Sequence, residues 1–137
     1  MAKISVFLCV VLVVSVAFAY DPEEERQKIQ EQAVKNCVRS INRVFTEVAQ
    51  KYEKTVKPME NEEMRNKAWD YYSKAADILN GLNAQVRNSK EPIRMSFVLK
   101  TFGGNAIMCS DDVSRKVYDA FYDAYDGLDK LAQQDGQ

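Results

Sequence analysis

A long amphipathic stretch from Asp21 to Lys54 limits what this chain can fold into more than any other feature. Asp21 can cap a helix, and Pro22 is favoured as the first helical residue. Apolar residues then recur with helical spacing on one side of the stretch: Ile29, Ala33, Val34, Cys37, Ile41, Val44, Phe45, Val48 and Tyr52. Such a helix would be about 50 Å long at 1.5 Å per residue. Its apolar side must be covered by other helices or by a partner.

The first residues are typical of a secretory signal peptide. Lys3 supplies a positive charge, an apolar run covers 4–16, and Ala17-Phe18-Ala19 matches the small-x-small cleavage pattern. The run is too short for a comfortable membrane span, which needs about 20 residues. We therefore expect residues 1–19 to be a signal peptide and residues 20–137 to be a single helical domain that is secreted and extracellular, with no transmembrane segment.

The cysteines then predict one disulfide. Cys9 would leave with the signal peptide, so that Cys37 and Cys109 remain as an even pair in an oxidising compartment. Two buried free thiols, or pairing between molecules, are the alternatives. Because sequence does not give the distance between the two Cα atoms, the bridge is a hypothesis that geometry must test.

Two further long helices follow the first. Asn61 is a suitable N-cap for the second, which should finish near Asn88, and Ser110-Asp111-Asp112 opens the last. Gly81 inside the second pattern indicates either close packing against the first helix or a bend. The apolar stripe of the second helix is Met64, Ala68, Tyr71, Ala75, Ile78, Leu79, Leu82 and Val86, and that of the last is Val113, Val117, Ala120, Phe121, Ala124, Leu128 and Leu131.

Between these helices, a dense apolar segment runs from Ile93 to Phe102 and is followed by Gly103-Gly104. We interpret it as a short helix that the glycines cap, with a buried strand as the alternative. The predicted class is therefore all-α: a small antiparallel bundle of three long amphipathic helices and one short helix, fastened by one disulfide.

The residue types exclude most enzyme classes. There is no His, which removes the commonest general base and metal ligand, and no phosphate-binding or dinucleotide-binding glycine motif occurs. The formal net charge is −1, so the basic footprint of a nucleic-acid-binding protein is missing. The acidic residues of the last helix, Asp112, Asp119, Asp123 and Asp126, fit a solvated face better than a calcium site. We expect no enzyme activity, cofactor, metal or nucleic acid.

Aromatic side chains are the best candidates for binding. The residues that we single out for a ligand or a partner are Trp69, Tyr72, Phe97, Tyr118, Phe121 and Tyr125. They can belong to an ordinary core with tyrosine hydroxyls at its rim. They can also line a cavity between helices or form a patch for a protein partner.

The sequence thus predicts a secreted, non-enzymatic helical protein that acts by binding an unknown protein partner or by homo-oligomerisation. A carrier of a small apolar ligand or lipid is the first alternative, and a membrane-active, toxin-like protein is the second. The mixed polar faces argue against the latter, because membrane-active helices are usually rich in Lys and Arg.

Overall fold

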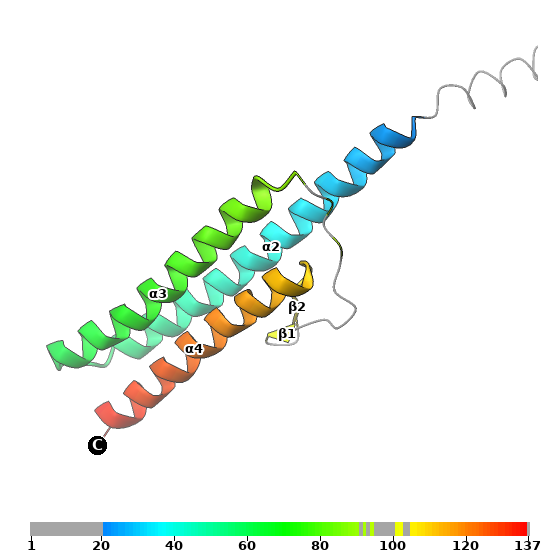
Figure 1. Cartoon of the computed structure of the whole chain (residues 1–137). Coiled ribbons are helices and arrows are strands. Elements are labelled where there is room, and N and C mark those ends of the chain that lie inside the picture. Colours follow the sequence, from blue (N-terminus) through cyan, green and yellow to red (C-terminus); the bar gives the residue numbers. More distant parts are fainter. Residues whose placement is uncertain (1–20, 91, 93, 95–100, 103–104, 137) are drawn as a thin grey trace, which may run out of the picture. The chain divides into compact units, whose positions relative to one another are not determined.

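Three long helices make up most of the described chain, which in this computed structural model comprises residues 21–90, 92, 94, 101–102 and 105–136. The elements in chain order are α2 (Pro22–Val56), α3 (Glu62–Arg87), β1 (Thr101–Phe102), β2 (Asn105–Ala106) and α4 (Asp111–Asp135) (Figure 1). The predicted all-helical class and its three long helices are confirmed. The expected signal peptide, residues 1–19, lies outside the described residues.

The chain divides into two compact parts, residues 1–31 and residues 32–137. The described portion of the first part is the beginning of α2. Here Asp21 acts as the predicted cap, because its Oδ1 accepts a hydrogen bond of 3.0 Å from the backbone N–H of Glu23. Three glutamates in the first turn place negative charge at the positive end of the helix dipole. Ile29, which the sequence placed at the edge of the apolar face, is 63% exposed.

In the second part, α2 from Gln32 onward, α3 and α4 lie side by side, and consecutive helices run antiparallel (Figure 1). Phe45 of α2 meets Tyr72 of α3, whereas Tyr52, two turns later, meets the earlier Trp69. The first and last helices run in the same direction, as the disulfide between Cys37 and Cys109 and the later contact between Lys51 and Asp129 require.

The core is built from the apolar stripes that the sequence predicted. In its main cluster, α2 supplies Cys37, Ile41, Val44 and Val48, α3 supplies Ala75, Leu79, Leu82 and Val86, and α4 supplies Val113, Val117, Ala120 and Ala124. A smaller cluster comprises Met59, Ala68, Leu128 and Leu131. Ile107 and Cys109, both fully buried, extend the main cluster beyond the helices. The side chains at the centre of the main cluster are almost completely excluded from water, as close packing requires.

Local signals account for the ends of α3. Asn61 accepts a hydrogen bond of 3.2 Å from the backbone N–H of Met64, and Asn88 is the C-cap. The guanidinium of Arg65 donates to the Met59 carbonyl at 3.1 Å, which ties the connection between α2 and α3 to the first turn of α3. Both predicted ends of this helix are confirmed.

The predicted fourth, short helix is not matched. Most of its span, including Ile93 and residues 95–100, lies outside the described residues, but its predicted end at Thr101–Phe102 is a β-strand. This strand pairs antiparallel with Asn105–Ala106, with Thr101 opposite Ala106 and Phe102 opposite Asn105. Gly103-Gly104, which the sequence placed as the cap of this helix, lies outside the described residues.

The disulfide is confirmed by geometry. The Sγ atoms of Cys37 and Cys109 are 2.06 Å apart and the Cα atoms 4.7 Å apart, within the range for a native bridge. Ser40, one turn further along α2, is buried and accepts a hydrogen bond of 3.0 Å from the backbone N–H of Met108. The segment that enters α4 is thus tied to the middle of α2 by one covalent bond and one hydrogen bond.

Candidate functional site

Four aromatic side chains meet where α2 lies against α3. The ring centroids of Tyr52 and Tyr72 are 4.9 Å apart in a stacked arrangement, and the indole of Trp69 lies 5.8 Å from the first and 5.6 Å from the second. Phe45 completes the set with an edge-on contact to Tyr72 at 6.2 Å. We call these four residues, Phe45, Tyr52, Trp69 and Tyr72, the aromatic seam.

The helical period places this seam on the surface. Phe45 and Tyr52 are seven residues apart on α2, and Trp69 and Tyr72 are three apart on α3, so each pair shares one helix face. Three members of the seam are partly buried, but Trp69 is 53% exposed. The rings pack directly on one another. Phe45 and Tyr72 also pack against the main core cluster and Tyr52 packs against the smaller one, so the seam is a partly buried set of rings whose half-exposed member is Trp69.

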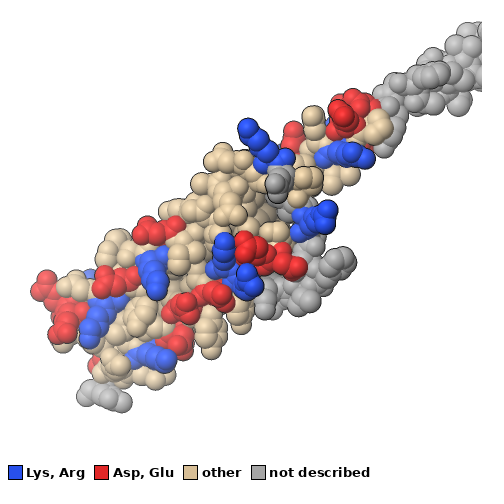
Figure 2. Space-filling view, in the orientation of Figure 1, with Lys and Arg blue, Asp and Glu red and all other residues tan. Residues whose placement is uncertain are grey.

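Several positions beside the seam are small or uncharged. Ala49 lies between the two α2 aromatics on the helix face, and Ala76 follows Tyr72 by one turn. Beyond them, the Asn83 side chain donates a hydrogen bond of 3.1 Å to Asn42 across the helix pair. Elsewhere the molecule is different: Figure 2 shows positive and negative side chains interspersed over the face in view, with no large field of one sign.

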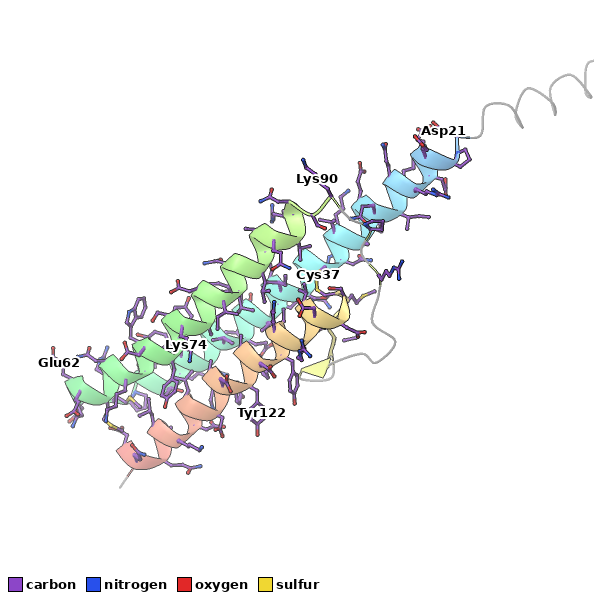
Figure 3. The ribbon with its side chains drawn as sticks, viewed as in Figure 1. Asp21, Cys37, Glu62, Lys74, Lys90 and Tyr122 are labelled. Carbon is purple, nitrogen blue, oxygen red and sulfur yellow. A yellow bond between two sulfur atoms is a disulfide. The ribbon has the colours of Figure 1, made fainter. Side chains whose placement is uncertain are left out.

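The aromatic residues of α4 form separate pairs. Tyr118 stacks on Tyr122 with centroids 6.1 Å apart, and Phe121 lies 5.2 Å from Tyr125. Tyr118 and Phe121 pack against the main core cluster, whereas Tyr122 is 55% exposed (Figure 3). No ring contact that we describe joins these pairs to the aromatic seam.

Lys51 fixes Tyr125 in place between α2 and α4. Its Nζ forms an ion pair with Asp129 and lies 4.5 Å from the centroid of the Tyr125 ring. The Lys51 side chain is only 22% exposed, so that water screens these contacts less than it screens a fully exposed pair. These contacts with Lys51 account for the position of the Tyr125 ring as part of the packing between α2 and α4.

Exposed ion pairs perturb two titratable groups on α4. The hydrogen bond from Lys116, at 3.1 Å, and the charge of the same side chain lower the pKa of the Asp112 carboxyl below its ordinary value, with Arg115 adding to the effect. The hydrogen bond to Asp126, at 3.0 Å, raises the pKa of Lys130. Both pairs follow helical spacing on the solvent side, which is the ordinary arrangement of charges on a helix.

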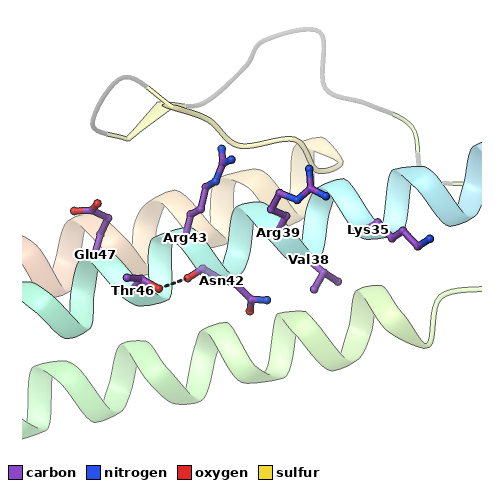
Figure 4. Close-up of a pocket in the computed structure, with 7 residues that line it drawn as sticks. All are labelled: Lys35, Val38, Arg39, Asn42, Arg43, Thr46 and Glu47. Atoms are coloured by element: carbon purple, nitrogen blue, oxygen red, sulfur yellow. Dashed lines mark hydrogen bonds between the residues drawn. The ribbon is translucent and has the colours of Figure 1, made fainter.

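Described residues of the helices line several surface hollows. The first, of about 580 Å³, is on the outer side of α2 and contains Arg39 and Arg43 (Figure 4). A second, of about 270 Å³, lies between α3 and α4 over Ala75, Ala124 and Gly127. A third surrounds the C-terminal end of α2 near Lys54 and Lys57. Among the described residues, no group of three or more His, Cys, Asp or Glu side chains could hold a metal ion. Nor does any described helix have the length and apolar character needed to cross a membrane.

The structure divides the residues that the sequence singled out. It brings Trp69 and Tyr72 together in the aromatic seam, and it places Tyr118, Phe121 and Tyr125 in pairs along α4. Phe97 lies outside the described residues. From the sequence, Phe45 was placed only on the apolar face of the first helix, whereas Trp69 and Tyr72 were expected opposite the uncovered part of that face near Tyr52, and both rings contact Tyr52. The signal for these contacts is the antiparallel order of α2 and α3, which pairs late α2 positions with early α3 positions.

Comparison with protein-family models, with curated proteins and with solved structures found no match for this chain.

Proposed function

We propose that this chain is a secreted, non-enzymatic helical protein that acts by contact with another protein chain through the aromatic seam. The observation that carries the proposal is the half-exposed Trp69 within three other aromatic rings. Trp and Tyr are the residue types most enriched among those that dominate binding energy at protein interfaces. A partner that covered the exposed half of the Trp69 indole would remove apolar surface from water.

The residues beside the seam support a protein partner. Charged residues are depleted at the centre of interfaces because their desolvation is costly, whereas polar residues form the rim. Ala49 and Ala76 flank the rings, and their small side chains leave the aromatic groups accessible to a flat partner surface. The pair of Asn42 and Asn83 lies beyond them. The seam therefore has the composition of an interface centre with a hydrogen-bonding edge.

A photo-crosslinking amino acid tests this proposal directly. Position 69 is compared with position 122, because Trp69 and Tyr122 are similarly exposed, at 53% and 55%, on different helices. In the fluid of the producing tissue, the variant with the crosslinking residue at position 69 should form a discrete cross-linked product, either a dimer or a complex with another chain. The variant with the same residue at position 122 should not form this product. Equal products from both positions, or none from position 69, would contradict the proposal.

A small apolar ligand is the alternative occupant of this protein. The hollow between α3 and α4 is its candidate location, because small side chains, Tyr71 and Ile78 line it, although four charged residues also do: Lys74, Asp123, Asp126 and Lys130. Its volume, about 270 Å³, is slightly below that of the usual ligand pocket, which is about 300–1,000 Å³. Saturable uptake of a fluorescent fatty acid, lost when Ile78 is replaced by Lys, would favour this alternative over a protein partner.

A further inference from the structure

Two exposed asparagines on α3 are each followed by a small residue. Asn80 precedes Gly81 inside the helix, and Asn88, the C-cap, precedes Ser89. In such pairs the following backbone nitrogen can approach the carbonyl carbon of the asparagine side chain, and this approach starts deamidation. Glycine hinders the approach least, because it has no Cβ. Residue type alone therefore favours reaction at Asn80.

The helix opposes this approach at Asn80. The attack requires the Asn80 backbone to rotate out of the helical conformation, which breaks hydrogen bonds in the interior of a helix of 26 residues. Leu79 and Leu82 flank the Asn-Gly pair, are 1% and 5% exposed, and belong to the main core cluster. Opening this turn therefore exposes core side chains, and its free energy approaches that of global unfolding.

The backbone at Asn88 is held less firmly. Asn88 has φ −94° and ψ 2°, so it has already left the α-helical conformation. Its N–H donates to the Ala84 carbonyl at 3.0 Å, whereas the N–H of Ser89 donates to the carbonyl only three residues earlier, that of Val86, at 3.3 Å. Asn88, Ser89 and Lys90 are exposed, and Figure 3 shows Lys90 past the end of α3. Rotation at Asn88 disturbs only a helix end, where exposed residues open at little cost in free energy.

We propose that Asn88 is a site of spontaneous deamidation in the folded protein and reacts faster there than Asn80. The backbone nitrogen of Ser89 attacks Cγ of Asn88, and the side-chain nitrogen leaves with the proton of that N–H as ammonia. The product is a cyclic imide. Water then opens the ring at either carbonyl and gives aspartate or isoaspartate. The net reaction consumes water, releases ammonia, and needs no oxidant or reductant.

The product carries a charge in an unfavourable place. The C-terminal end of a helix is the negative end of its dipole, so a carboxylate at the C-cap weakens the last turn. Isoaspartate also inserts a methylene group into the backbone before Ser89, which disturbs the turn that closes on Val86. The modified chain adds one negative charge to the formal net charge of −1. This inference concerns the end of α3 and does not depend on the aromatic seam.

Prolonged incubation of the folded whole chain at neutral pH, followed by peptide mapping with mass spectrometry, tests the inference. The matched variant is Ser89→Gly, which gives position 88 the same Asn-Gly pair that stands at position 80, and glycine is favoured directly after a C-cap. In this folded variant, product at position 88 should form about tenfold or more faster than at position 80, because only the cost of opening the backbone differs. In guanidinium chloride the two rates should agree within about twofold, since neither pair is then held in a helix.

The wild-type chain gives a second comparison that needs no variant. Asn88 should react first in the folded protein and Asn80 first in guanidinium chloride. Asn88→Gln should give no product at position 88 over the same period, because the longer side chain closes the ring more slowly. The inference is overturned if Asn80 reacts as fast as Asn88 in the folded wild-type protein, or if neither reacts there while both react in denaturant. It is also overturned if the two positions of Ser89→Gly keep the same ratio of rates with and without denaturant.

Discussion

Two glycines within helices should respond in opposite ways to the same substitution. Gly81 of α3 is exposed, and a Cβ added there would meet no atom within 4 Å. Gly127 of α4 is buried, and a Cβ there would lie 2.5 Å from Cδ1 and Cε1 of Tyr71. Since carbon atoms in contact are normally about 3.5–4.0 Å apart, the ring must move by roughly 1 Å or more.

The magnitudes follow from helix propensity and packing. Gly81→Ala should raise the free energy of unfolding by about 0.5–1 kcal/mol, because Ala has less conformational freedom to lose in a helix. Gly127→Ala gains the same term but overpacks the contact with Tyr71, which typically costs about 1–3 kcal/mol. Tyr71 is 40% exposed and can swing outward, so we expect the lower half of that range and, after the propensity gain, a net destabilisation of up to about 1.5 kcal/mol.

Urea denaturation followed by far-UV circular dichroism measures both variants, with the disulfide intact. The slope of unfolding free energy against urea should not change, because neither variant alters the surface exposed on unfolding. The decisive comparison is a double-mutant cycle with Tyr71→Ala. In that background, Gly127→Ala should become stabilising by about 0.5–1 kcal/mol, as at Gly81. If Gly127→Ala stabilises the wild-type background as much as Gly81→Ala does, the reasoning from the Tyr71 contact is refuted.

Three other predictions concern the ties between helices and their charges. Replacing both Cys37 and Cys109 with Ser should lower the free energy of unfolding by about 4 kcal/mol, because the bridge closes a loop between residues 72 apart and so reduces the entropy of the unfolded chain. A loss below about 1 kcal/mol in urea denaturation would contradict this argument. Lys51→Met should lower the free energy of unfolding by about 1 kcal/mol, because the contacts with Asp129 and Tyr125 are lost. Lys130 is exposed, so Lys130→Met should lower it by less than about half of that. Equal losses for the two variants in thermal melts would count against the assigned role of Lys51. The lowered pKa of Asp112 means that its ion pairs contribute stability above the unfolded-state pKa, about 3.9, and that this contribution is lost as the pH falls through the folded-state pKa. Asp112→Asn should therefore flatten the fall in stability between about pH 5 and pH 2, and a pH profile parallel to that of wild type would show that Asp112 has no such role.

The parts of the fold that the sequence predicted well are those set by local signals. The cap residues Asp21 and Asn61 and the C-cap Asn88 stand where the pattern placed them. The disulfide followed from cysteine count and compartment, and its geometry agrees. Short-range physics was sufficient for these features.

The features that the sequence did not predict depend on contacts between distant segments. The sequence indicated close packing or a bend at Gly81, but a Cβ added there would meet no atom within 4 Å. The glycine at which a neighbouring side chain comes close is Gly127, where the Tyr71 ring lies against the backbone. Which glycine faces a neighbouring ring depends on the relative register of α3 and α4, which no local pattern contains. Likewise, Thr101–Phe102 forms a strand because Asn105–Ala106 pairs with it, and two residues are too few to show the alternation that identifies a strand.

The candidate site shows the same limit. The sequence placed Trp69 and Tyr72 opposite the face of the first helix near Tyr52, whereas the contact of Phe45 with Tyr72 depends on the register between α2 and α3.

The disulfide also determines what proteases can release. The bond between Cys37 and Cys109 closes the backbone into a covalent ring that contains the whole of α3 and both β-strands. A single cut anywhere from residue 38 to residue 108, including the connection between Val56 and Glu62, opens this ring without separating the two fragments. A nicked molecule therefore remains one covalent unit, heavier by one water, until a reductant breaks the disulfide. A protein exposed to extracellular proteases could in this way lose the continuity of its chain and still keep α2, α3 and α4 together.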